Sequence, residues 1–367
     1  MTVRLPPGET AGMEFVPALV LCRRFHDEVV GPLLARRLPG LRYSAGLLDG
    51  GSELLGLDTE RSTDHDWGPR AQVFLADASE VASVRAALAD LPASFLGRPT
   101  RFLSWPTARL GVPDVGGDRS GVQVFPWRDW LRGRLGFDPR VAVTTDDWLS
   151  LPTQRLAELT GGAVFHDGLS GTVGAVRAAL AWYPDDVWRH VLAAGWTRVG
   201  QAEHLVGRCA EVGDELGSRL VAARVARDLM RLGLLVRRRW PPYDKWLGSV
   251  FAALPDAGPV VAALGDALGP GDWPHRQAGL VRALETVAGW TNDTGLAGPV
   301  DVAARPFHGR PFLVLDAPRL ATALRAAIVD PALRARPLVG AVDQYVDSVD
   351  VLTHADRVRR VSAVVAG

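Results

Sequence analysis

Two short stretches near residue 60 carry residue types that suit phosphate and metal chemistry. The run GGSELLG begins at Gly50, and Asp64 and Asp66 follow thirteen and fifteen residues after Gly51. On an extended strand, residues two apart lie on one face, so the two carboxylates would lie together. Two close carboxylates repel each other unless a cation lies between them, and Mg²⁺ is the cation that accompanies triphosphates. The pair therefore predicts a Mg²⁺ site.

The Gly-Ser turn before this pair predicts a phosphate site. An apolar run over residues 43–48 predicts a strand, and it leads into Gly51 and Ser52. A strand that ends in such a turn presents backbone N–H groups to an anion. The absent side chain of Gly51 would let a phosphate approach the backbone, and the Ser52 hydroxyl adds a donor. Each motif has a plainer interpretation when it is taken alone. The Gly-Ser motif would be an ordinary turn, and the Asp-x-Asp pair would be a solvated strand end.

The periodicity of apolar residues predicts an α+β chain. Strands and helices alternate over the first 145 residues, with a helix at 14–37, strands at 71–76 and 121–127, and a helix at 78–91. Helical periodicity dominates from about residue 144, with helices expected at 146–160, 184–205, 211–239 and 243–254. Three regions are therefore predicted: an α/β domain over 1–145, a helical domain over 146–255, and a C-terminal helical extension over 256–367.

Composition excludes several classes of protein. The 41 Lys and Arg residues balance 41 Asp and Glu residues, which excludes a globally basic nucleic-acid coat or a polybasic membrane binder. Two cysteines cannot build a disulfide scaffold, and there is no P-loop signature. The chain has no run of eighteen apolar residues, and its first fifteen residues lack the apolar core of a signal peptide. A cytoplasmic location without a membrane partner is therefore expected.

The Gly-Ser turn and the Asp-x-Asp pair, in this order and at this spacing, resemble the signature of the polymerase-β-like nucleotidyltransferase superfamily. Further stretches, GAVFHDG near residue 165, YPDDVW at 183–188 and RRRWPPYDKW at 237–246, resemble a bacterial nucleotidyltransferase-like family of unknown function. The resemblance spans most of residues 14–255. It implies an N-terminal α/β domain of polymerase-β type, followed by a helical domain that closes the cleft. It also implies that Gly51 and Ser52 hold the β,γ-phosphates of a nucleoside triphosphate (NTP), and that Asp64 and Asp66 are metal ligands.

One feature departs from the superfamily pattern. Members often carry a third carboxylate on a later strand, beside the first two. The best-placed strand here is GVQVFPW, whose outward position is Gln123, and the nearest acid, Asp129, falls past the strand end. An amide cannot act as an anionic ligand, so the second metal site and full catalytic competence are in question.

The helical half offers acidic residues that could act as a base. Glu211, Asp214, Glu215 and Ser218 are spaced to share one face of a single helix. The plainer interpretation is a solvated acidic face. By resemblance to antibiotic-modifying nucleotidyltransferases, a carboxylate of the helical domain would be the general base for an acceptor hydroxyl, with Asp214 favoured over Glu211.

Two cations of the helical half are candidates for neutralising the triphosphate. Arg231 lies within a predicted helix, and Lys245 follows the Pro-Pro break near the start of another. Lys245 is the only lysine in the chain. Specific phosphate chemistry would explain its retention, and so would codon bias, because the chain favours Arg throughout.

The expected function is transfer of a nucleoside monophosphate from an NTP to an acceptor hydroxyl, with Mg²⁺-dependent release of pyrophosphate. A small-molecule acceptor is favoured because no basic nucleic-acid surface is visible in the sequence. Two alternatives stay open. One is nucleotidyl transfer to tRNA or to a protein, and the other is a catalytically impaired nucleotide-binding or scaffold protein.

Overall fold

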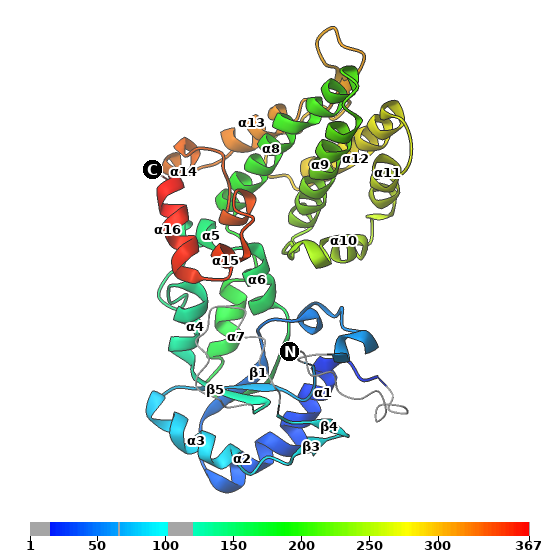
Figure 1. Ribbon diagram of the computed structural model, residues 1–367. Helices are drawn as coiled ribbons and strands as arrows, with labels where there is room; N and C mark the ends of the chain where they lie inside the picture. The colour runs from blue at the N-terminus through cyan, green and yellow to red at the C-terminus, as the bar shows by residue number, and fades with distance from the viewer. Residues whose placement is uncertain (1–14, 65–66, 102–119, 367) are drawn as a thin grey trace. The chain divides into compact units, whose positions relative to one another are not determined.

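The computed structural model describes residues 15–64, 67–101 and 120–366, and it confirms the α+β class (Figure 1). The chain divides into two compact units. The first comprises Met1–Trp130 and Gly161–Ala175, and the second comprises Leu131–Thr160 and Val176–Gly367. This division differs from the predicted domains in two ways. A later segment returns to the first unit, and residues 256–367 belong to the second unit together with the preceding helices.

The first unit is built on a mixed four-stranded sheet with the strand order β5-β2-β1-β6. The strands are β1 (Tyr43–Leu47), β2 (Ala71–Leu75), β5 (Val122–Pro126) and β6 (Ala163–Asp167). Strand β1 is antiparallel to both β2 and β6, whereas β2 and β5 are parallel. Strand β6 was not predicted. It comes from within the region expected to be helical and supplies the edge of the sheet beside β1.

Helices cover the apolar face of this sheet. The predicted helix over residues 14–37 is found as α1 (Ala18–Phe25), a five-residue π-helix (His26–Val30) and α2 (Gly31–Arg37). Together with α3 (Val81–Leu88), they bury a core against inward-facing strand residues such as Ala45, Val73 and Val124. The neighbours of Val73 and Val124 in sequence, Gln72 and Gln123, belong to the opposite face of the sheet. A two-stranded hairpin, β3 (Ser94–Phe95) with β4 (Arg98–Pro99), completes the described part of this unit.

The second unit is mainly helical. Two helices, α4 (Trp127–Leu135) and α7 (Thr172–Ala179), cross the division between the units. The longest helices are α8 (Asp185–Glu211), α9 (Glu215–Val236) and α12 (Trp273–Asp293). The shorter ones are α5 (Thr145–Ser150), α6 (Thr153–Thr160), α10 (Asp244–Ala252), α11 (Gly258–Leu268), α13 (Pro318–Ala326), α14 (Pro331–Ala335), α15 (Val349–Leu352) and α16 (Ala355–Ala366). Two short strands, β7 (Arg305–Pro306) and β8 (Leu313–Val314), form a hairpin.

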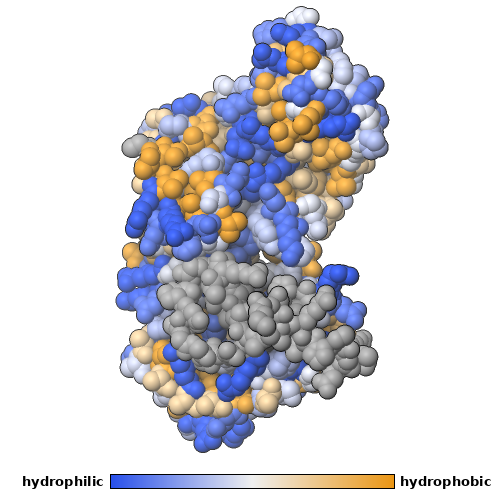
Figure 2. Space-filling model, in the orientation of Figure 1, coloured by the Kyte–Doolittle hydropathy of each residue, from blue (hydrophilic) through white to orange (hydrophobic). Residues whose placement is uncertain are grey.

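Two tryptophan indoles make hydrogen bonds inside this helical unit. The indole Nε1 of Trp196 donates to the hydroxyl of Thr291 at 3.1 Å, and that of Trp188 donates to the carbonyl of Leu235 at 3.1 Å. On the face that Figure 2 shows, hydrophilic and apolar residues are interspersed over the second unit. Within the described ranges, no helix has both the length and the hydropathy required to span a membrane.

A buried histidine makes the stability of the second unit dependent on pH. Burial lowers the pKa of His190 to about 4, and the positive charges of Arg336 and Arg325 add to this effect. Because the unfolded chain binds a proton near pH 6.5 and the folded chain does not, stability is lost as pH falls from 6.5 towards 4. We expect a loss of about 3 kcal/mol over that window.

The measurement is the free energy of unfolding against pH for the wild type, for His190→Gln, and for His275→Gln, which alters an exposed histidine. The pH dependence between 6.5 and 4 should shrink only in His190→Gln. An identical pH profile in all three proteins would show that His190 is protonated in the folded state.

Candidate functional site

The Gly-Ser turn lies directly after β1 and is open to solvent. Gly50 and Gly51 have φ angles of +61° and +107°, which favour glycine, and a 3₁₀ helix over Ser52–Leu55 follows. Gly51 is exposed and Ser52 is half-buried. The Ser52 hydroxyl makes no hydrogen bond to any residue that the structure describes, and it is therefore available to a ligand.

A buried ion pair lies beneath this turn. The guanidinium of Arg70 pairs with the carboxylate of Glu53, and their side chains are only 2% and 4% exposed. A Cβ atom at Gly51 would overlap the Glu53 carboxylate. Glycine is therefore required at position 51 by its φ angle and by Glu53, which is a different reason from the predicted approach of a phosphate.

Two further contacts fix the turn from neighbouring strands. The side-chain Oε1 of Gln72, on β2, accepts a hydrogen bond from the backbone N–H of Leu48 at 2.8 Å. Gly162, just before β6, donates its N–H to the carbonyl of Leu54 at 3.2 Å. A Cβ atom at Gly162 would overlap the carbonyl of Leu47. The turn is thus held by β2 on one side and by the start of β6 on the other.

The segment that follows the Asp-x-Asp pair is also anchored. Trp67 is buried, and its indole Nε1 donates to Asp58 Oδ2 at 3.3 Å. The same carboxylate oxygen accepts the N–H of Ala18, at the start of α1, at 2.7 Å. The backbone N–H of Arg70 donates to the sulfur of Cys22 at 3.3 Å, and burial raises the pKa of that thiol to about 12. Cys22 is therefore a protonated core residue.

The structure only partly describes the predicted metal ligands. Asp66 lies outside the described residues, as does the side chain of Asp64. The backbone of Asp64 closes a 3₁₀ helix, Glu60–Asp64, and β2 begins only at Ala71. The expectation of an extended strand at Asp64 was therefore wrong. Its role as a metal ligand stays a prediction. The described residues contain no group of three or more His, Cys, Asp or Glu suited to a metal ion.

Amides occupy the sheet face where a third carboxylate was sought. Gln72 and Gln123 are register partners in the parallel pair β2–β5. Gln72 is fully buried, and its Nε2 has no hydrogen-bond partner among the described residues. Asp129 is exposed in the first turn of α4, past the end of β5 as expected. Strands β2 and β5 therefore bring no acid to this face. The acid that the described strands do place there is Asp167 of β6, whose carboxylate accepts a hydrogen bond from the Ser44 hydroxyl at 2.8 Å.

The acidic residues of the helical half do not share one helix. Helix α8 ends at Glu211, Gly213 adopts a φ of +76°, and α9 begins at Glu215. Asp214 caps α9 and accepts the N–H of Gly217 at 2.8 Å. Glu211 pairs with Arg310 at 2.5 Å. The predicted common face was wrong because Gly213 interrupts the helix, and the role of Asp214 or Glu211 as a base stays a prediction.

The two predicted cations have different surroundings. Arg231, in α9, is largely buried and pairs with Asp343 at 2.6 Å, so a carboxylate of its own unit already balances its charge. Lys245 is exposed in the first turn of α10, as predicted, and its ammonium lies 4.6 Å from the centre of the Trp246 ring. Their assignment to a triphosphate stays a prediction.

Comparison with known families identifies one segment of the chain. A family model described as a domain of unknown function, DUF4037, matches residues 148–247. The matched segment begins within α5, contains β6, α8 and α9, and ends within α10. It confirms the predicted likeness to a family of unknown function, but it does not reach the turn at Gly51. The comparisons with curated proteins and with solved structures found no match.

The buried pair beneath the turn should dominate the stability of the first unit. Glu53→Gln removes the carboxylate charge that pairs with the buried Arg70 guanidinium, so we expect the free energy of unfolding to fall by about 3–5 kcal/mol. As a control, Asp90→Asn breaks the ion pair between Asp90 and Arg37, whose two side chains are 50% and 59% exposed, respectively. This variant should lower the free energy of unfolding by at most about 1 kcal/mol. Urea unfolding of both variants tests this, and equal losses would contradict the account.

Proposed function

We propose that this protein is a nucleotidyltransferase that moves a nucleoside monophosphate from an NTP to the hydroxyl of a small molecule. One observation carries the proposal. The buried Glu53–Arg70 pair fixes an exposed Gly-Ser turn to the segment that directly follows Asp64 and Asp66. A rigid turn with an unoccupied hydroxyl suits a triphosphate, because binding then costs little ordering of the protein.

The donor chemistry of the Asp pair fits Mg²⁺. Asp64 and Asp66 offer hard carboxylate oxygens two residues apart, and hard oxygens are the ligands that this ion prefers. When bound, Mg²⁺ would stabilise the negative charge that develops on the α-phosphate. The anchors at Trp67 and Arg70 would hold the segment that carries these carboxylates.

The chain's own residues would then bind and orient the substrates. The Ser52 hydroxyl and the backbone of the turn would hold the β- and γ-phosphates. The acceptor oxygen would form the new bond to the α-phosphorus, the bond to the β-phosphate oxygen would break, and pyrophosphate would leave. Asp214, or Glu211, would accept the proton of the acceptor hydroxyl. Lys245 is the better candidate for an added cation, because Asp343 already balances Arg231.

The amide pair on the sheet favours a second candidate function, a nucleotide-binding protein without turnover. Gln72 and Gln123 are register partners on β2 and β5, where enzymes of the superfamily that the sequence resembles often carry an additional acid. Amide side chains bring no negative charge, so a second metal ion would be bound weakly there. This candidate predicts tight NTP binding without release of pyrophosphate.

The Asp pair gives the first test. Asp64→Asn and Asp66→Asn preserve shape but remove charge, so pyrophosphate release should fall by several orders of magnitude while the melting temperature is unchanged. The assay incubates each labelled NTP with Mg²⁺ and cell extract as the source of acceptor. Glu60→Gln is the control, because it removes an exposed acid of the 3₁₀ helix that contains Asp64, and it should keep wild-type turnover.

Wild-type rates in either Asp variant would refute the assignment. NTP binding without turnover in the wild type would select the second candidate.

The turn gives an independent test by binding. Ser52→Ala should weaken the affinity for a non-hydrolysable NTP by about 1–2 kcal/mol, because one hydrogen bond to a charged group is lost. Ser83→Ala, on α3, is the matched control and should bind normally. Gly51→Val is a poorer test, because a side chain there would displace Glu53 with or without ligand. Unchanged affinity in Ser52→Ala, measured by calorimetry, would mean that this hydroxyl does not touch the phosphates.

A further inference from the structure

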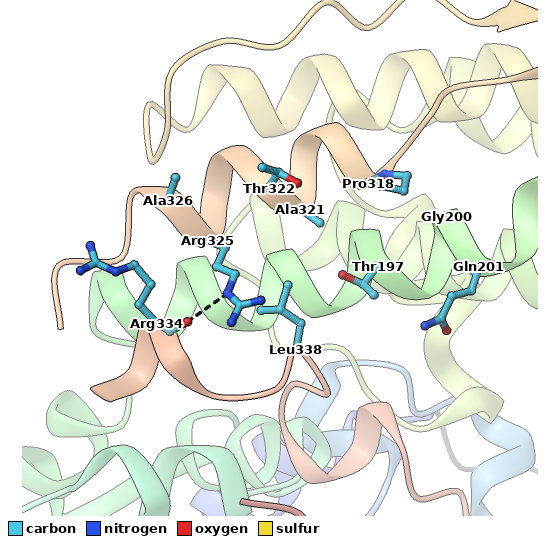
Figure 3. Close-up of a pocket in the computed structure, with 10 residues that line it drawn as sticks. All are labelled: Thr197, Gly200, Gln201, Pro318, Ala321, Thr322, Arg325, Ala326, Arg334 and Leu338. Atoms are coloured by element: carbon cyan, nitrogen blue, oxygen red, sulfur yellow. Dashed lines mark hydrogen bonds between the residues drawn. The ribbon is translucent and has the colours of Figure 1, made fainter. Parts of the chain in front are cut away.

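A cavity of about 540 Å³ lies between α8 and α13 in the second unit (Figure 3). Its walls come from residues 197–201 of α8 and residues 318–326 of α13, with Arg334 of α14 and Leu338 closing one side. The volume is within the range of about 300–1,000 Å³ that small-molecule sites occupy. The cavity is therefore large enough for an organic ligand.

Fixed contacts at both ends maintain this space. At one end, a Cβ atom on Gly200 would lie 2.6 Å from the ring of Pro318, so the two helices touch there. The buried carboxylate of Glu203 also accepts the backbone N–H groups just before α13, at 2.7 and 2.9 Å. At the other end, Asp186 accepts the N–H groups of Val329 and Asp330 at 3.0 and 2.8 Å. These contacts hold α8 and α13 in place at both ends of the cavity, so the space between the two helices is maintained by the fold.

Two arginines give the cavity a positive charge. The Nε of Arg325 donates to the carbonyl of Arg334 at 2.9 Å, and Nη1 of Arg334 donates to the carbonyl of Ile328 at 3.2 Å. In Figure 3, the Arg325 guanidinium points between the helices towards Leu338, while Arg334 lies at the rim. Neither guanidinium forms an ion pair with a carboxylate of the described chain, and the lining contains no acidic residue.

The charge of Arg325 acts on its surroundings, and no carboxylate of the described residues forms an ion pair with it. After burial and the charge of Arg336, it contributes to the lowered pKa of His190, which precedes Thr197 on α8 by about two helical turns. Beside this charge, Pro318, Ala321 and Leu338 offer an apolar surface. A guanidinium next to apolar walls matches a ligand that has a carboxylate or phosphate at one end and an apolar body at the other.

We propose that this cavity binds a small organic anion, with the anionic group on Arg325, assisted by Arg334, and the apolar body against Pro318, Ala321 and Leu338. This site is separate from the candidate nucleotide site and does not depend on the proposed function. Carboxylates and phosphates share the required chemistry, so the experiment includes both.

Calorimetric titration of the full chain tests the proposal with phenyl phosphate and benzoate as probes. At least one probe should bind, and phenol, which lacks the charge, and inorganic phosphate, which lacks the ring, should bind more weakly. Arg325→Gln should weaken binding about tenfold or more, because a charge-assisted pair is lost, and Arg334→Gln should have a smaller effect. Arg224→Gln removes the same charge from an exposed position on α9 and should leave the affinity unchanged.

A second variant covers the case in which Arg325→Gln disturbs α14. Ala326→Phe keeps both arginines and places an aromatic ring at an exposed edge of the cavity, so it should block the probes while the melting temperature is maintained. A non-hydrolysable NTP should bind equally to all of these variants if it uses the other site. Absence of binding by both probes at millimolar concentration, or wild-type affinity in Arg325→Gln and Ala326→Phe, would overturn the proposal.

Discussion

Glu53 and Arg70 place opposite charges in the interior of the first unit, where each offsets part of the cost of burying the other. Their pairing forces two separate segments together, the turn after β1 and the segment before β2. The pair also explains why position 51 is a glycine, since the Glu53 carboxylate occupies the space that a side chain would need there. The ion pair thus converts a flexible sequence motif into a fixed, solvent-exposed turn.

The rest of the first unit supports this arrangement. One face of the sheet packs against α1, α2 and α3, and the other carries the polar register pair Gln72–Gln123. Gln72 connects the sheet to the turn, because it lies within β2 and its side chain accepts a hydrogen bond from the backbone just before the turn. At this register pair, amide side chains supply hydrogen bonds without charge. Strands β2 and β5 thus add no carboxylate to the proposed metal site, whose ligands would be Asp64 and Asp66.

Local signals in the sequence were sufficient for much of the fold and for part of the site. Alternating apolar residues predicted β1, β2 and β5, and the Gly-Ser turn was correctly placed after β1. Pairings between distant residues were missed. Strand β6 is short and lies among helices, so its pairing with β1 has no local signal. Likewise, Glu53 and Arg231 look like surface charges until Arg70 and Asp343 are placed beside them, 17 and 112 residues away. Gly213, which separates α8 from α9, was a helix-end signal that the acidic spacing obscured.

Hydrogen–deuterium exchange of the full chain, with and without a non-hydrolysable NTP and Mg²⁺, tests the central claim most directly. The account predicts that the nucleotide slows exchange in peptides covering residues 48–58, because the phosphates would contact the backbone of the turn. It also predicts that this protection requires Mg²⁺ and disappears in Asp64→Asn. Nucleotide binding that protects other segments and leaves residues 48–58 unchanged would contradict the account.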